Sequence, residues 1–431
     1  MSTHKTAACC LALPLAFYLA MSLGAQPAAA EEITSDNWTE KVGFKPDLSK
    51  AADVKKGKKV TKKNLAKFKH LVPPGMQLLI EKYDLKMKLK PYETIHPSEG
   101  YIAATNKQLG KAKIIDVGKD YRKRGLENYV SGLPFPNPKT GLEVAWNYQY
   151  AYMGDDGDSL FTVYWISATA GIEHTELWRW AFILRTLNRT DVEPIPAIKS
   201  FEEKGLQYTS ITYAIEPYDK KGFGALYSRA VKPLDQQGHI YVPAMRRVLR
   251  NTFGTRGDTW NSTDLLYEDV RGYMGYPEWM NWTIKEKTTL LMPIDAKVAV
   301  GKGNADKVFD LKKPPHWNPT IYYEPRPTYV IEVTPKFPDY PYKRMVFYVD
   351  AETYIIIYKE AYDKKGDFWK MMLMGWNAPE DMDTHPPVLS VGLVVDLQAE
   401  HATLINMHKS EANTNLDPKM FTLSNLRKRG R

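Results

Sequence analysis

The residues that could do chemistry are few and lie far apart in this sequence. Residues 173–176 (EHTE) place a histidine between glutamates, and His401 and His408 follow only much later. The seven-residue spacing of His401 and His408 lies in sequence of strand character, where an odd spacing puts side chains on opposite faces. The acidic segment GDDGD (154–158) lacks the later glutamate of a calcium loop. We therefore expect no metal site, and a hairpin turn at GDDGD.

Catalytic signatures are also missing from the sequence. It contains no G-x-S-x-G elbow, no H-E-x-x-H pair and no phosphate-binding P-loop. Its two cysteines, Cys9 and Cys10, lie in a predicted leader, so the processed chain would have no thiol for a disulfide, a metal or a nucleophile. We predict that the protein is not an enzyme and needs no cofactor.

The N-terminus has the pattern of a secretory signal. Lys5 precedes an apolar run from Leu11 to Leu23, and residues 28–30 are alanines that match an A-x-A cleavage site. The run is shorter than the roughly 20 residues of a membrane-spanning helix. We predict a signal peptide over residues 1–30, cleaved near Ala30, and export of the rest.

The positive charge is concentrated in one segment. The formal net charge is +9, and residues 41–70 contain eleven lysines but only two acidic residues, Asp47 and Asp53. Lysines without arginines or interleaved aromatic rings lack the forked donors and stacking faces that read nucleic acid. Nucleic acid is therefore not an expected partner. An anionic membrane surface could attract this segment, and a solvated segment around one amphipathic helix is the alternative.

The helical signals are sparse. Leu65, Phe68, Leu71 and Val72 are spaced as one helical face before two prolines. Residues 176–188 (ELWRWAFILRTLN) predict a second helix, and short helical pieces are expected near residues 262–269. We expect residues 31–130 to be a lysine-rich N-terminal arm with a helix that wraps a main β domain over residues 131–431.

The main domain reads as strands separated by turn signals. Many strands joined by hairpins, with few helices, predict an antiparallel sheet that curls. The expected strands are 144–153, forming a hairpin with 159–170, then 208–219, 328–336, 345–349, 354–363 and 367–376.

The last two of these strands are apolar on both faces. A sheet with one wet face would alternate apolar and polar residues, so both faces must be covered. The predicted helix 176–188 could cover one face. A second sheet, a closed barrel interior or a hydrophobic ligand would cover the other. The methionines and tryptophans favour an adaptable cavity.

The residues predicted to line a hydrophobic ligand site are large apolar or aromatic ones. They lie on these strands, on 176–188 and on the aromatic run 264–282, which is too apolar for an open surface and must be core or a ligand or partner contact. The set is Trp165, Trp178, Tyr267, Tyr273, Met274, Trp279, Phe347, Ile356, Tyr358, Trp369, Met372 and Trp376. Arg246 and Arg247 could bind an anionic headgroup, or they could serve a solvated face.

Two groups of motifs carry a family resemblance. GLPFPNPKTGLEVAWN (132–147) with HIYVPAMRRVLR (239–250) resembles a family of uncharacterised exported Gram-negative proteins with a domain of unknown function. RMVFYVDAETYIIIYKEAYDKKGDFWK (344–370), with DLLYEDVRGY before it and NLDPKMFTLSNLRK after it, is similar to the C-terminal half of outer-membrane lipoprotein-sorting proteins.

The resemblance implies a mainly β fold with some α structure. It would be a large curled antiparallel sheet forming an incomplete β-barrel covered by helices, with an interior that accepts acyl chains. It also implies a periplasmic location, and partners among outer-membrane proteins or inner-membrane transporters. The chain is about twice as long as a sorting protein, so a lipoprotein and another hydrophobic ligand are both open as cargo.

Two hypotheses follow. The leading one is a periplasmic binding or carrier protein for a lipid or other hydrophobic molecule, acting in transport to or from the outer membrane. The alternative is a structural or assembly factor that docks on an outer-membrane or transporter partner through Tyr267 to Trp282.

Overall fold

The computed structural model describes residues 1, 32–251, 257–298, 300–301 and 303–429. From Ile33 onward these residues belong to one compact unit. The predicted signal peptide lies outside the described residues beyond Met1. Within the described part of the chain, no helix combines the length and the apolar character needed to cross a membrane.

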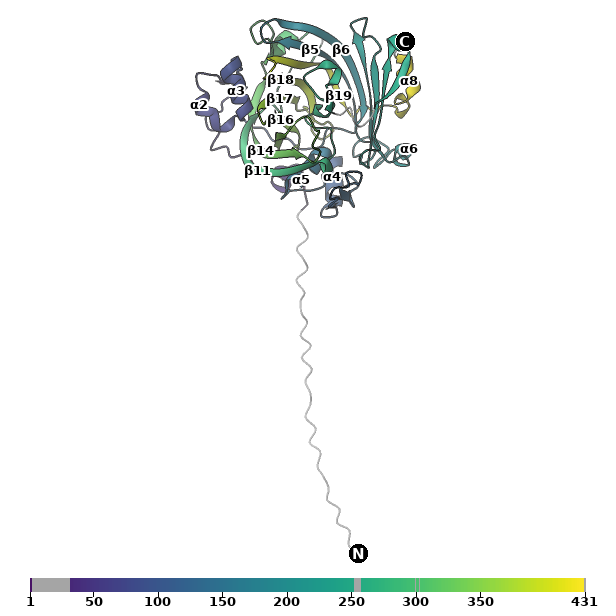
Figure 1. The fold of residues 1–431 in the computed structure, drawn as a ribbon. Coiled ribbons are helices and arrows are strands. Elements are labelled where there is room, and N and C mark those ends of the chain that lie inside the picture. Colours follow the sequence, from purple (N-terminus) through teal and green to yellow (C-terminus); the bar gives the residue numbers. More distant parts are fainter. Residues whose placement is uncertain (2–31, 252–256, 299, 302, 430–431) are drawn as a thin grey trace. The chain divides into compact units, whose positions relative to one another are not determined.

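One large sheet forms the centre of this unit, and it consists of two antiparallel meanders (Figure 1). The strands of the first meander are β5 (Asp156–Ser167), β6 (Gly171–Ile183), β7 (Leu206–Glu216), β8 (Gly224–Ala230), β9 (Gln237–Val242) and β10 (Arg247–Asn251). Those of the second are β11 (Met280–Met292), β14 (Tyr322–Pro335), β15 (Arg344–Asp350), β16 (Ile356–Tyr362), β17 (Phe368–Asn377), β18 (Val388–Asp396) and β19 (His401–Ala412).

The two meanders join where β19 pairs with β5, in a register that runs from His401 opposite Ser167 to Ala412 opposite Gly157. At the other end, β14 pairs with β11 and, in parallel, with β2 (Met87–Leu89), which pairs with β1 (Lys59–Val60). The sheet is therefore mixed but mostly antiparallel, and it does not close. The predicted mainly β fold with a large incomplete sheet is confirmed.

Short helices and two small ladders complete the described structure. The helices are α1 (Trp38–Val42), α2 (Leu65–Phe68), α3 (Pro74–Tyr83), α4 (Glu99–Gln108), α5 (Gly141–Gln149), α6 (Lys199–Glu202), α7 (Ala305–Val308) and α8 (Leu423–Arg429). The ladders pair β3 (Lys113–Ile114) with β4 (Leu126–Glu127) and β12 (Phe309–Asp310) with β13 (Asn318–Pro319).

Three local predictions were wrong. Residues 176–188, predicted as a helix, are mostly strand β6, because pairing with β5 and β7 on both sides outweighs the local apolar spacing. Residues 144–153, predicted as a strand, largely belong to helix α5, which begins with a capping box between Thr140 and Glu143. The segment GDDGD is not a hairpin turn, because Asp156 already begins β5.

The outer cover of β16 and β17 comes from the lysine-rich N-terminal segment. The predicted helical stretch before the prolines is α2 followed by a 3-10 turn, and α3 begins at Pro74. A Cβ on Gly75 would lie 2.5 Å from Met371 Sδ and 3.0 Å from Phe368 Cζ, so α3 packs directly on β17. Figure 1 shows α2 and α3 on one side of the sheet. The proposed division into an arm and a domain at residue 130 stays a prediction.

A buried charge network joins residues 38–95 to β14 and to the turn after β15. The Arg326 guanidinium is fully buried and pairs with Asp350, with Glu324 and with Glu352. Glu352 also accepts hydrogen bonds from Thr39 and from the backbone of Ile95. Because an unpaired buried charge is costly, this network fixes the N-terminal segment on the sheet.

Acid outnumbers base in this network. Lys90 adds a second cation and pairs with Glu324 at 2.8 Å and with Asp295 at 2.6 Å. Two buried cations therefore face four buried carboxylates, those of Asp295, Glu324, Asp350 and Glu352, and the exposed Lys297 also contacts Asp295. Burial raises the pKa of Glu324 to about 7, although Arg326 and Lys90 oppose the rise.

This shift predicts that stability falls with rising pH in a defined window. The folded state binds the Glu324 proton more tightly than the unfolded chain, so the contribution is complete below pH 4.5 and disappears above 7. We expect the free energy of unfolding in urea to fall by about 1 kcal/mol between pH 6 and pH 8 through this group. In Glu324→Gln that part of the fall should vanish. Parallel pH profiles for the two proteins would contradict the assignment.

Candidate functional site

A covering segment, residues 257–279, lies between the two meanders in the sequence. It packs against one face of the sheet, called the inner face; the outer face is the one covered by α3. It contains three 3-10 turns, Trp260–Ser262, Tyr267–Asp269 and Pro277–Trp279. The first two are the helical pieces expected near residues 262–269. The segment is mostly buried, so it forms a layer of the core rather than a surface loop.

A cavity of about 220 Å³ lies between this covering segment and the sheet. Its walls come from β5 to β9, from β17 to β19 and from residues 260–279, so both meanders contribute. The lining is mainly apolar and includes Phe161, Trp180, Leu226, Ile240, Trp260, Leu265, Leu373, Met374, Leu389, Leu393, Val394, Ile405 and Met407.

A buried ion pair fixes the covering segment to the sheet. Lys359 of β16 donates from Nζ to Asp269 Oδ1 at 2.5 Å and to the carbonyl of Gly272 at 3.2 Å, and both charged side chains are fully buried. Tyr342 donates its hydroxyl to the other carboxylate oxygen of Asp269 at 2.7 Å. Every polar atom of this contact is satisfied within the protein, which is the condition under which a buried pair is tolerated.

Gly272 allows the covering segment to approach the sheet closely. Its φ is +95°, and a Cβ there would lie 2.9 Å from Ile356 Cγ2. A larger residue would be strained in its backbone and would collide with β16.

The next residue of β16 anchors the opposite face. Glu360 accepts a hydrogen bond at 2.7 Å from the backbone N–H of Gly75, at the beginning of α3. Successive residues of a strand point to opposite faces, so Lys359 anchors the inner cover and Glu360 the outer one. This arrangement explains why β16 and β17 are apolar on both sides.

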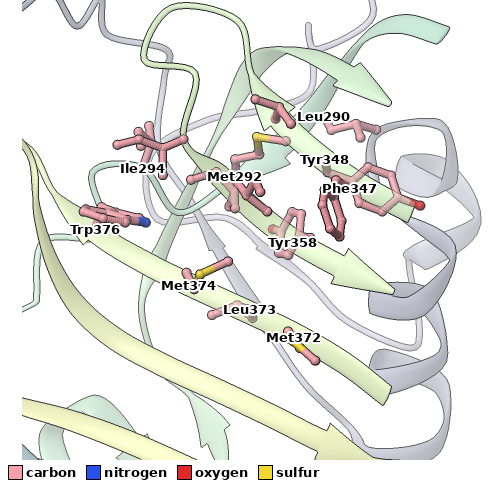
Figure 2. Close-up of a cluster of buried hydrophobic side chains, with 14 of the residues drawn as sticks. Leu290, Met292, Ile294, Phe347, Tyr348, Tyr358, Met372, Leu373, Met374 and Trp376 are labelled. Atoms are coloured by element: carbon pink, nitrogen blue, oxygen red, sulfur yellow. The ribbon is translucent and has the colours of Figure 1, made fainter. Parts of the chain in front are cut away.

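Four of the predicted ligand residues line the cavity: Tyr267, Met274, Trp279 and Met372. Three others, Phe347, Tyr358 and Trp376, belong to a packed cluster with Met292 and Leu290, which Figure 2 shows beside β17. Tyr358 donates its hydroxyl to the carbonyl of Leu291 at 2.6 Å. Trp376 lines a smaller cavity of about 40 Å³.

The remaining predicted ligand residues have partners within the protein. The indole N–H groups of Trp165, Trp178 and Trp369 donate to Ser262 O, Glu176 and Asp396. The Tyr273 hydroxyl donates to the carbonyl of Tyr276, and Ile356 packs on Gly272. The structure therefore does not bring the predicted set together at one site, and a ligand role for its members stays a prediction.

The cavity also contains residues that the sequence analysis missed. Met374 lies two positions after Met372 on β17, so the same alternation could have found it. Leu389 and Leu393 belong to β18, a strand that was not predicted. Arg271 lies in the aromatic run 264–282, and a site predicted from apolar residues gives no reason to include a charged one.

Arg246 and Arg247 lie apart from the cavity. They sit at the turn between β9 and β10, and both side chains are exposed. They are not among the lining residues of the cavity, and their headgroup role stays a prediction.

His401 and His408 form hydrogen bonds with other protein groups and not with each other. His401 Nδ1 lies 2.8 Å from Asp264 Oδ2, and this contact raises the pKa of the imidazole. His408 contacts the hydroxyl of Thr162 and the carbonyl of Gly301. Among the described residues, no group of three histidine, cysteine, aspartate or glutamate side chains is arranged to hold a metal ion.

The ion pair under the covering segment predicts a stability cost. Lys359→Met leaves Asp269 as a buried charge without its cation, and we expect the free energy of unfolding to drop by about 3–5 kcal/mol. The double variant Lys359→Met with Asp269→Asn should recover part of that loss, because it removes both charges. Urea unfolding of the two variants measures the difference. Lys365→Met, on an exposed turn, is the matched control, and an equal loss in that control would refute the prediction.

Comparisons with known proteins place the chain in a family. A family model described as "Protein of unknown function (DUF1329)" matches residues 59–427. Uncharacterized protein PA3922 of Pseudomonas aeruginosa is 24% identical over 375 residues, covering 82% of this chain and 76% of that protein.

Similar solved structures were also found. They include a putative outer membrane lipoprotein-sorting protein domain from Vibrio parahaemolyticus (17% identity, TM-score 0.47, 67% of this chain and 98% of that one). A DUF1329 family protein from Desulfovibrio piger is similar as well (16% identity, TM-score 0.45, 66% and 97%). Since the family model spans most of the sequence, this chain belongs to the DUF1329 family of proteins of unknown function.

Proposed function

We propose that this protein binds a lipid or another hydrophobic molecule in the cavity under the covering segment. It would carry that molecule through the periplasm, to or from the outer membrane, without covalent catalysis. The observation that carries the proposal is an apolar cavity of about 220 Å³ inside a tightly packed β protein. Protein interiors are normally close-packed, with few voids larger than a water molecule.

The energetic cost of such a cavity supports a functional reason for it. Empty apolar volume costs about 24 cal/mol per Å³, so this space would cost on the order of 5 kcal/mol if it were closed to water and nothing filled it, and its opening lowers that cost. That loss is comparable with the whole net stability of many domains, about 5–15 kcal/mol. A bound apolar molecule would restore the missing contacts.

The size of the cavity limits its occupant. An apolar cavity of about 150 Å³ can bind a benzene-sized molecule, and sites for drug-sized ligands begin near 300 Å³. The cavity here suits one slim chain or ring system rather than several acyl chains side by side. Gln236, His239 and Ile240 line it and are only half-buried, so we expect a ligand to enter beside β9.

The burial of the aromatic run does not favour the alternative of a docking factor. That alternative needed Tyr267 to Trp282 as a contact surface. Tyr273, Tyr276 and Trp279 are at most 3% exposed, because they pack in the interior. These side chains are not available on the surface for a protein partner.

Filling the cavity should abolish ligand binding. Ala225 of β8 lines the cavity, and in Ala225→Trp the indole would occupy the space that a ligand needs. We expect the variant to bind a fluorescent fatty-acid probe at least tenfold more weakly than the parent chain. Organic extracts of the variant should also contain less lipid by mass spectrometry. Ala399→Trp, on the exposed turn after β18, is the matched control. If neither protein carries lipid nor binds the probe, the proposal fails.

The exposed lysines of the N-terminal segment provide a membrane contact in this proposal. Lys55, Lys56, Lys58 and Lys59 are all exposed, and each could contribute roughly 1 kcal/mol near an anionic surface. The core side chains Leu65 and Phe68 lie in the same segment, so deleting it would also remove part of the core. Charge removal is therefore the cleaner test.

Replacing these four lysines by glutamine should weaken co-sedimentation with vesicles of phosphatidylglycerol by at least tenfold. The same number of changes at Lys312, Lys313, Lys364 and Lys365, which are also exposed, should have a smaller effect. Equal effects of the two sets would show that the attraction depends on the net charge of the protein and not on this segment.

A further inference from the structure

Arg271 is a cation at the wall between two cavities. It lies in the covering segment, next to Gly272, and lines both the large cavity and the smaller one of about 40 Å³. Trp180, Leu389 and Met407 line both cavities as well, so the two spaces adjoin at this point. The guanidinium therefore stands where two apolar spaces meet.

The guanidinium has little to bind within the described part of the protein. Arginine offers five N–H donors, but the one described acceptor for Arg271 is the Met153 sulfur, a weak acceptor. No ion pair joins Arg271 to any described carboxylate. Glu268 and Asp269 line the same cavity, yet neither pairs with Arg271, and Asp269 already pairs with Lys359.

The neighbouring arginines are fixed by other contacts. Arg185 donates to the carbonyls of Gln149 and Ala151, and Arg229 donates to the carbonyls of Met274 and Gly275 and to the side chain of Gln149. These acceptors are neutral, and the nearby carboxylate of Glu278 opposes only part of the charge of Arg229. Burial lowers the pKa of Arg271, and the charges of Arg185 and Arg229 lower it further. An anion at this position would be stabilised by all three cations.

We propose that the ligand is a single-chain amphiphile with an anionic group, and that Arg271 is the counter-ion of that group. This inference rests on the proposed function, since it assumes that the cavity holds an apolar molecule. The volume admits one slim chain, and a carboxylate or a phosphate monoester provides the oxygens that a guanidinium binds through paired N–H donors. The exposed Arg246 and Arg247 would not be the headgroup site.

The test is displacement of a neutral fluorescent lipid probe from the full processed chain by four ligands with the same eight-carbon chain: octanoic acid, octyl phosphate, octan-1-ol and methyl octanoate. We expect at least one of the two anions to bind tenfold or more tightly than the neutral pair. Comparison of the acid with the phosphate distinguishes the two anionic groups. This ranking needs no variant, so it stands even if a variant fails to fold.

Variants assign the preference to a residue. Arg271→Met should lower the affinity for the preferred anion to that of octan-1-ol, and the binding of octan-1-ol that remains shows that the variant folds. Arg271→Lys should retain part of the preference. Arg427→Met, on exposed α8, is the matched control.

Three results would overturn the inference, and they are distinguishable. Equal binding of anionic and neutral ligands would refute the anionic ligand and leave the hydrophobic carrier in place. A preference lost in the double variant Arg246→Met with Arg247→Met, but kept in Arg271→Met, would move the headgroup site to the β9–β10 turn. Failure of all four ligands to bind would remove the proposed function as well.

Discussion

The cavity depends on the buried ion pair between Lys359 and Asp269. A covering segment held only by apolar contacts would settle onto the sheet until the voids closed, because close packing is favoured everywhere in an interior. Here the segment is fixed at a polar point, where Lys359 reaches Asp269 and the Gly272 carbonyl. A buried pair cannot shift without leaving a charge unsatisfied, so the segment keeps its place and the space next to it stays open.

The same strand explains how two very different layers enclose the sheet. Glu360 binds the first turn of α3 on the outer face, directly after Lys359 on the inner one. A second set of buried charges, centred on Arg326, fixes residues 38–95 against β14 and the turn after β15. The N-terminal segment is thus part of the core, although its lysine content resembles that of a solvated tail. Its charges lie on the surface while Leu65, Phe68 and Met76 are buried.

Local pattern predicted β14 to β17 of the second meander well, but not β11 or β18, and it predicted the site poorly. Strands β15, β16 and β17 agree with the predicted ones, because turn residues and alternation are local signals. The strand β6 was predicted as a helix, because Trp178 and its neighbours match either period. The helix α5 was predicted as a strand, although Thr140 and Glu143 form a capping box at its start. The cavity could not be predicted, because it needs β19 to pair with β5 across most of the domain. No local pattern encodes that pairing, and it alone brings Met372 near Phe161 and Trp180.

The inner face of the sheet therefore has a filled half and an open half, and β17 lies at the boundary. Beside β15 the inner face is filled by Phe347, which packs against Tyr273 and Trp282, whereas Met372 and Met374 line the cavity. Methionine is flexible and polarizable, and it adapts to partners of different shape. Such a wall discriminates weakly between apolar chains, since one methylene changes affinity by only about 0.8 kcal/mol. Any sharp selectivity must come from a polar group in the wall, because a buried charge left without its partner costs far more than a misplaced methylene.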